Sequence, residues 1–190
     1  MKFVILHGSL GTPTDNYFPW LSEELKKMKH EVVCPQLPTP EGQEVEKWVT
    51  MIKNTVDSLG GPDEETVFVA HSMSPLAVCH YLNSIDKRVK ACFFTSGFAD
   101  NRGFKEPFLS LSQSFVDRPI DWQKVKRNCQ NIVCFVGDND PYVPSEILKE
   151  FSKVCGGEFI IIPGGGHLNS EFGFTKFPLL LETIKKVLLS

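Results

Sequence analysis

Ser72 lies between a predicted strand and a predicted helix, a position at which a serine hydroxyl can act as a nucleophile. The segment Ala70-His71-Ser72-Met73-Ser74 follows the predicted strand Thr66–Ala70 and leads directly into a helical pattern. A sharp turn between strand and helix lifts the central hydroxyl above the edge of a sheet, if the residues two before and two after it are small. Ala70 and Ser74 are small, although glycine is usual at both positions. This pattern predicts a nucleophilic Ser72; the alternative is that Ser72 only caps the helix.

A histidine follows a later strand in the same way. Pro163-Gly164-Gly165-Gly166-His167 comes directly after the predicted strand Glu158–Ile162. Three consecutive glycines give this loop unusual backbone freedom. Histidine is also the side chain whose ordinary pKa suits proton transfer near neutral pH. A lone histidine is more often structural, but this position favours His167 as the base that takes the Ser72 proton.

An acidic loop follows the predicted strand Asn131–Val136. Its sequence is Gly137-Asp138-Asn139-Asp140-Pro141, and a carboxylate here would accept the Nδ1–H proton of the histidine. We favour Asp140, because the proline after it restricts its backbone to an extended conformation. Asp138 stays open as the second choice, since an aspartate beside glycine is typical of an ordinary turn.

The loop after the first predicted strand, Lys2–Leu6, carries the sequence His7-Gly8-Ser9-Leu10-Gly11. Acyl transfer requires two backbone N–H groups that donate to the developing oxyanion, one of them from the residue after the nucleophile. We therefore expect the donors to be Met73 and Ser9, with Leu10 as the second choice for the loop donor.

Other uses of these loops are poorly supported. No Gly-Lys-Ser or Gly-Lys-Thr follows the first loop, so a phosphate loop is not indicated. His7 and His71 have no carboxylates or further histidines at ligand spacing, so we expect no metal site. We expect these two histidines to fill space and to form local hydrogen bonds.

The elements that must position these residues alternate along the chain. The predicted strands are Lys2–Leu6, Glu31–Cys34, Thr66–Ala70, Ala91–Thr95, Asn131–Val136 and Glu158–Ile162. The predicted helices are Tyr17–Met28, Glu44–Leu59, Met73–Ser84, Pro144–Val154 and Phe177–Leu189. Such alternation predicts a parallel α/β sheet, and continuous apolar strands indicate that helices cover both faces. Ligands bind beyond the carboxyl ends of such strands, where the polar loops fall.

Composition limits the class of protein. The chain has 190 residues, which we expect to form a single domain (1–190), and 42% of them are hydrophobic. With a formal net charge of −3 and no basic stripe, we expect no nucleic-acid partner. The six cysteines are scattered without a C-x-x-C pair, which indicates buried free thiols in a reducing compartment. No run approaches the ~18 apolar residues of a membrane span, so we expect a cytoplasmic protein.

Over almost its whole length, the chain resembles the small α/β-hydrolases of the retinoblastoma-binding protein nine and YdeN-like family. The shared motifs are the His7-Gly8 loop before Trp20-Leu21, Pro35-x-Leu37-Pro38-x-Pro40 with Trp48 downstream, the Ser72 elbow, the Gly137-x-x-Asp140-Pro141 loop and Gly165-Gly166-His167. The Leu-Pro-x-Pro segment is the most family-specific of these. The Leu-x-Cys-x-Glu motif linked to pocket-protein binding is absent, so no protein partner is inferred.

The resemblance implies an α/β-hydrolase fold, with a compact six-stranded parallel sheet in the order 2-1-3-4-5-6 and no large cap domain. It also implies a serine hydrolase that acts on small carboxylic esters or amides and needs no cofactor. The chemistry expected of Ser72, His167 and Asp140 is attack on an acyl carbonyl through an acyl-enzyme intermediate. Esterase, thioesterase and peptidase activities share this chemistry.

The substrate pocket is the part with the weakest pattern. The long connection Ser96–Gln130 carries several aromatic residues that could line an acyl pocket or simply pack the domain. We expect Leu10, Leu37, Phe98 and Tyr142 near the substrate. Because Ser74 replaces a glycine, the alternative function is a hydrolase-fold binding module without turnover. A nucleotide-binding doubly wound domain would fit the alternation, but the glycine-rich phosphate loop is missing.

Overall fold

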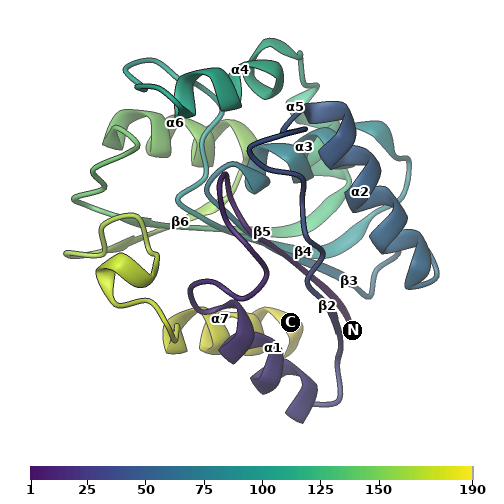
Figure 1. Cartoon of the computed structure of the whole chain (residues 1–190). Helices are drawn as coiled ribbons and strands as arrows, with labels where there is room; N and C mark the ends of the chain where they lie inside the picture. The colour runs from purple at the N-terminus through teal and green to yellow at the C-terminus, as the bar shows by residue number, and fades with distance from the viewer. Residues whose placement is uncertain (190) are drawn as a thin grey trace.

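A single parallel sheet forms the centre of the computed structural model, which describes residues 1–189 (Figure 1). Its strands are β1 (Lys2–Leu6), β2 (Glu31–Val33), β3 (Thr66–His71), β4 (Val89–Thr95), β5 (Cys129–Gly137) and β6 (Glu158–Ile162). The spatial order is β2-β1-β3-β4-β5-β6, and every neighbouring pair is parallel. The predicted fold class and strand order are confirmed.

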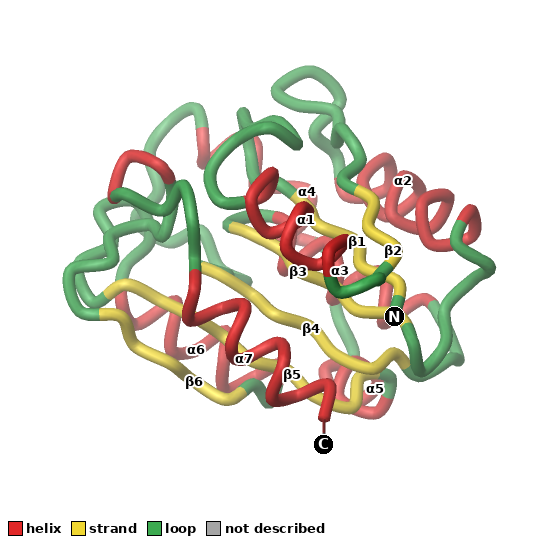
Figure 2. Tube along the Cα trace, turned by 90° about the horizontal axis from the view of Figure 1, so that it is seen from below, coloured by secondary structure: helices red, strands yellow, loops and turns green. Residues whose placement is uncertain are grey.

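Helices cover both faces of this sheet. One face carries α1 (Phe18–Lys27) and α7 (Pro178–Leu189), which lie side by side in Figure 2. The other carries α2 (Val45–Ser58), α3 (Ser74–Ser84) and α6 (Ser145–Cys155).

The four central residues of β3 are all apolar, because both faces of the strand are covered. Val67 and Val69 pack into the layer under α1 and α7, whereas Phe68 and Ala70 pack into the layer under α2 and α3. Successive side chains of a strand point to opposite faces, so a strand covered on both faces has no polar side. All six residues of β3 are buried, and its carboxyl end is thereby held rigidly in the middle of the sheet.

The connection between β4 and β5 differs from the expected long loop. It contains two further helices, α4 (Phe108–Asp117) and α5 (Trp122–Arg127). Phe115 of α4 packs against Trp48 of α2, with ring centroids 5.1 Å apart. The aromatic residues of the connection therefore partly serve to attach α4 to the domain.

A short 3-10 turn after β6, Ser170–Phe172, was also not predicted.

Two expectations from composition can be checked in the part of the chain that the structure describes. Among residues 1–189, no helix has both the length and the apolar character that crossing a bilayer requires. All six cysteines are free thiols, and five of them are buried.

Candidate active site

Ser72 lies at a sharp turn between β3 and α3, and its backbone has φ = +62°. This left-handed conformation is uncommon for a residue with a side chain and is typical of a nucleophile elbow. The Ser72 N–H donates to the Thr95 carbonyl at 2.9 Å, which fixes the turn to β4. A Cβ atom at Gly8 would lie 2.7 Å from the Ser72 Cβ, so the loop after β1 can pass this close only with glycine.

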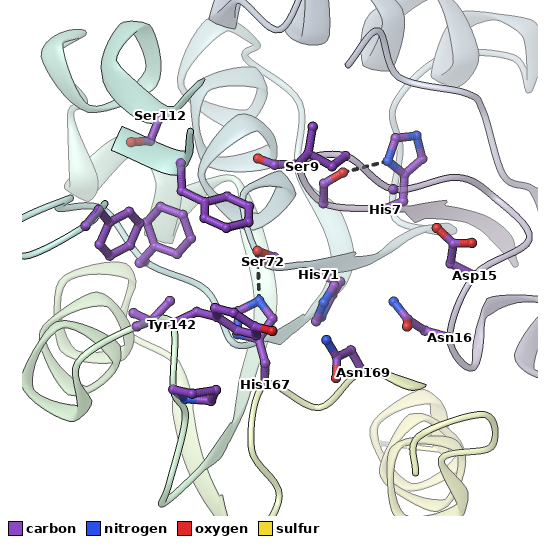
Figure 3. A pocket seen from close by; sticks show the side chains of 18 of the residues that line it. His7, Ser9, Asp15, Asn16, His71, Ser72, Ser112, Tyr142, His167 and Asn169 are labelled. Atoms are coloured by element: carbon purple, nitrogen blue, oxygen red, sulfur yellow. Dashed lines mark hydrogen bonds between the residues drawn. The ribbon is translucent and has the colours of Figure 1, made fainter. Parts of the chain in front are cut away.

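His167 lies between the other two predicted residues. Its Nε2 is 3.0 Å from the Ser72 Oγ, as the dashed line in Figure 3 shows, and its Nδ1 is 2.8 Å from the Asp140 Oδ2. The side chains of His167 and Asp140 are only 9% and 1% exposed. The folded chain thus brings together, in one hydrogen-bonded row, three residues that are up to 95 positions apart.

The two aspartates of the acidic loop have different environments. Asp140 faces the histidine, and its Oδ1 accepts from the backbone N–H groups of Tyr142 (2.9 Å) and Val143 (3.0 Å). Both carboxylate oxygens are therefore engaged and the direction of the group is set. Asp138 instead accepts from the Gly164 N–H at 2.8 Å, so it supports the glycine loop.

Two residues that position His167 were missed in the sequence. Asn139 accepts the Gly166 N–H through Oδ1 at 2.7 Å, and Ser96 donates through Oγ to the His167 carbonyl at 3.0 Å. Ser96 is fully buried and follows β4 directly. A polar residue after a strand was the signal that could have identified it.

The two expected backbone donors, the Met73 and Ser9 N–H groups, come from the residue after Ser72 and from the loop after β1. Within residues 1–189, the Met73 and Ser9 N–H groups have no hydrogen-bond partner. The Leu10 N–H, in contrast, donates to the Thr39 Oγ1 at 2.8 Å. Of the two candidates in the loop, only the Ser9 N–H therefore remains available to a ligand.

A cavity of about 530 Å³ opens over these groups. Leu10, Phe98 and Tyr142 line it, as expected. Leu37 does not: its side chain is fully buried in the core layer with α2, because the proline-rich segment directs it inward. That expectation was wrong.

The cavity has two chemically different sides. The apolar side is formed by residues from the β4–β5 connection and from the acidic loop, namely Phe98, Phe104, Phe108, Tyr142 and Val143. Figure 3 shows Tyr142 on that side of Ser72, and Asp15, Asn16 and Asn169 on the opposite side. The Asn169 Oδ1 is buried and has no hydrogen-bond partner in the described chain.

His7 and His71 line the same cavity as Ser72 and form local hydrogen bonds, as predicted. The His7 Nε2 accepts the Leu37 backbone N–H at 2.9 Å, so its Nδ1 carries the proton and donates to the Gly8 carbonyl at 2.8 Å. The His71 Nδ1 contacts the Thr95 Oγ1 at 2.9 Å. Burial lowers the pKa of His7, and it lowers the pKa of His71 well below the ordinary value. Both side chains are therefore neutral at pH 7.

Known proteins of similar sequence share almost the full length of this chain. The YdeN protein of Bacillus subtilis (strain 168) is 24% identical over 182 residues, which are 95% of this chain and 92% of YdeN. Serine hydrolase RBBP9 of Rattus norvegicus is 23% identical over 190 residues, which are 98% of this chain and 95% of RBBP9. The resemblance inferred from the motifs is thereby confirmed.

Solved structures and a family model complete the comparison. The crystal structure of the ydeN gene product of B. subtilis has a TM-score of 0.89 at 23% identity, with 100% of both chains covered. Est1E from Butyrivibrio proteoclasticus with bound ferulic acid has a TM-score of 0.75 at 17% identity, with 100% of this chain and 88% of Est1E covered. These similarities confirm the α/β-hydrolase fold. Because the serine hydrolase family model matches residues 3–186, the chain belongs to the serine hydrolase family.

Proposed function

We propose that this protein is an esterase that cleaves small carboxylic esters, and related thioesters or amides, with Ser72 as nucleophile. The observation that carries the proposal is the placement of His167, which contacts the Ser72 Oγ through one ring nitrogen and the Asp140 carboxylate through the other. This arrangement gives a serine hydroxyl a base and gives that base a partner for its positive charge.

The proposed reaction has two halves. The Ser72 Oγ attacks the ester carbonyl carbon while the His167 Nε2 takes the hydroxyl proton, and the Met73 and Ser9 N–H groups donate to the resulting oxyanion. The tetrahedral intermediate then breaks its bond to the alcohol oxygen, which receives the proton from His167. In the second half, water gives a proton to His167 and attacks the acyl carbon, and the acid departs as Ser72 regains its proton.

The cavity supports a substrate with two unlike ends. A volume of about 530 Å³ is that of a site for a small molecule. We propose that an apolar group with the size of an aromatic ring occupies the side of Phe98, Phe104 and Phe108. A hydrogen-bonding group then occupies the side of Asn16 and Asn169. The ferulic acid bound to Est1E is an aromatic acid of this general kind.

The test is covalent labelling by a fluorophosphonate probe, with the modified residue identified by mass spectrometry. We expect the wild type to be labelled on Ser72, and we expect Ser72→Ala and His167→Ala to remain unlabelled while folded. A folded wild type that resists the probe and hydrolyses no p-nitrophenyl ester would overturn the proposal and favour a binding module.

The acidic loop supplies a matched pair of variants for the same experiment. Asp140→Asn removes the charge beside His167 and is expected to lower kcat on the order of 10⁴-fold. Asp138→Asn makes the identical change two residues away and keeps an oxygen for the Gly164 N–H, so its kcat is expected to stay near the wild-type value. Equal losses in the two variants would exclude a specific role for Asp140.

A further inference from the structure

The proline-rich segment, residues 35–43, is the family-specific motif that the proposed reaction does not use. It runs from the end of β2 to the start of α2 and lies against the loop after β1, residues 7–11, which we call the oxyanion loop. At one end of the contact, the Leu37 N–H donates to the His7 Nε2 at 2.9 Å. Behind the segment, the Trp48 Nε1 donates to the Pro38 carbonyl at 2.7 Å and attaches it to α2. The segment is thus fixed on one side and faces the oxyanion loop on the other.

Thr39 and Gln43 form the central part of this contact. The Thr39 Oγ1 accepts the Leu10 N–H at 2.8 Å and donates its proton to the Gln43 Oε1 at 2.6 Å. The Gln43 Nε2 donates to the Ser9 Oγ at 2.6 Å and to the Leu111 carbonyl of α4 at 3.1 Å. Gln43 is only 6% exposed. Each polar atom of the two side chains has a partner, so a single arrangement of donors and acceptors satisfies the whole group.

The hydrogen bonds of Thr39 and Gln43 determine which N–H of the oxyanion loop has no partner. Thr39 occupies the Leu10 N–H, and Leu10 is held at φ = +60°, a conformation that costs a residue with a side chain on the order of 1 kcal/mol. The Ser9 N–H, one residue earlier, is left without a partner in the described chain, and Ser9 lines the same cavity as Ser72. Other hydrogen bonds hold the ends of the loop at His7 and Gly11, whereas Thr39 and Gln43 hold its central residues, Ser9 and Leu10.

We infer that Thr39 and Gln43 are positioning residues that hold the Ser9 N–H in place as the second oxyanion donor. The inference rests on the proposed function, and it assigns a role to the proline-rich segment. Neither side chain lines the cavity, so their effect on the reaction must pass through the loop. A group that acts on the transition state in this way changes kcat and leaves KM nearly unchanged.

The first experiment compares three changes at two threonines, the half-buried Thr39 and the buried Thr55. Thr39→Val replaces the hydroxyl by a methyl group of similar size, and we expect kcat on p-nitrophenyl acetate to fall about 10²-fold with little change in KM. Thr39→Ser keeps the hydroxyl and is expected to retain kcat within a few-fold of the wild-type value. Thr55→Val is the control, because it removes a hydroxyl from a threonine that is more buried than Thr39 and that lies in α2, outside the contact with the oxyanion loop. It should leave kcat unchanged.

A second readout isolates the oxyanion itself. A thionoester carries sulfur where the ester carries its carbonyl oxygen, and sulfur is a weak hydrogen-bond acceptor. Two well-placed N–H donors therefore favour the ester strongly over its thionoester analogue. We expect the ratio of the two kcat values to fall in Thr39→Val and to stay at the wild-type value in Thr39→Ser and Thr55→Val. Gln43→Leu removes the hydrogen bonds of Gln43 to Thr39 and Ser9 and should lower the same ratio. This variant still tests the inference if Thr39→Val folds poorly.

The outcomes separate this inference from the proposed function. If the wild type is labelled on Ser72 but Thr39→Val and Gln43→Leu keep both kcat and the ratio, the positioning role is wrong and the proposed function stands. If Thr55→Val loses as much kcat as Thr39→Val, the effect is one of general stability and the inference is again overturned. If the wild type is neither labelled nor active, the proposed function fails and the inference fails with it.

Discussion

At the scale of single residues, Ser74 stands where an elbow usually has glycine. Its Oγ accepts the His71 N–H at 2.9 Å and lies within 3.0 Å of the Leu6 and His71 carbonyl oxygens, which share its single proton. The residue is fully buried. The hydroxyl therefore links the end of β1 to the elbow, so this substitution for glycine adds contacts to the turn that bears Ser72.

Removal of that hydroxyl should weaken the fold. Ser74→Ala leaves the buried His71 N–H without an acceptor, and we expect the free energy of unfolding to fall by about 1 to 3 kcal/mol. Urea denaturation measures the change. Ser84→Ala makes the same chemical change at an exposed position of α3, where a difference of less than about 0.5 kcal/mol is expected. Equal midpoints for wild type and Ser74→Ala would show that the hydroxyl contributes nothing.

At the scale of secondary structure elements, α4 shows where sequence patterns were insufficient. Its sequence, Phe108–Asp117, contains three serines, which are weak helix formers, and its N-cap residue is Pro107, whose side chain cannot accept a hydrogen bond. Its stability comes from packing, for example between Phe115 and Trp48, and such packing is visible only once the fold is known. For α5, a signal was present, because Asp121 accepts two N–H groups of the first turn as an ordinary N-cap.

The start of α4 should contribute to the recognition of bulky esters. Phe108 lines the cavity, and its ring centroid lies 6.1 Å from that of Tyr142. We expect Phe108→Ala to lower kcat/KM for p-nitrophenyl 3-phenylpropanoate about 10-fold or more, because an apolar contact with a ring is worth roughly 1.5 to 3 kcal/mol. The acetate ester, which is too small to reach this side, should be unaffected.

The same two assays on Leu179→Ala provide the control. Leu179 is a half-exposed leucine of α7 and does not line the cavity. A similar loss in both variants, or an equal loss for both esters in Phe108→Ala, would contradict an acyl-binding role for α4.

At the scale of the whole molecule, the arrangement of parallel strands explains how much of the site could be predicted. Ser72, Asp140 and His167 each follow a strand, and the carboxyl ends of parallel strands meet at one edge. Their convergence therefore followed from alternation alone. The contact between Thr39 and Leu10 joins two irregular loops 29 residues apart, and no periodic pattern predicts such a pairing. Leu37 was misplaced for the same reason.

The buried histidines make the stability of the whole fold sensitive to acid. Burial lowers the pKa of His7, His30, His71 and His80 in the folded protein, while in the unfolded chain each returns to about 6.5. Below pH 6.5 the unfolded state therefore binds more protons than the folded state, and stability falls as the pH decreases. For the fully buried His71, the loss approaches 1.4 kcal/mol per pH unit.

Urea denaturation at pH 7.5, 6.5 and 5.5 tests this prediction. The free energy of unfolding should fall slightly between the first two values, because unfolded histidines are half protonated at pH 6.5, and should drop more steeply at the third. A His71→Asn variant should show a shallower drop, because it lacks the group with the most strongly lowered pKa. If the free energy of unfolding stays constant down to pH 5.5, the pKa values of these histidines are not lowered in the folded protein and the prediction is wrong.

The left-handed backbone of Ser72 also bears on how such a protein can evolve. Glycine is the residue for which this conformation carries no steric penalty, so selection for stability alone favours the loss of the serine. A chain with glycine at position 72 would keep its sheet, its helices and its two-sided cavity, and would lose only the hydroxyl. On the proposed function, one substitution therefore separates a hydrolase from a stable receptor for the same small molecule, and selection for turnover is what maintains the serine.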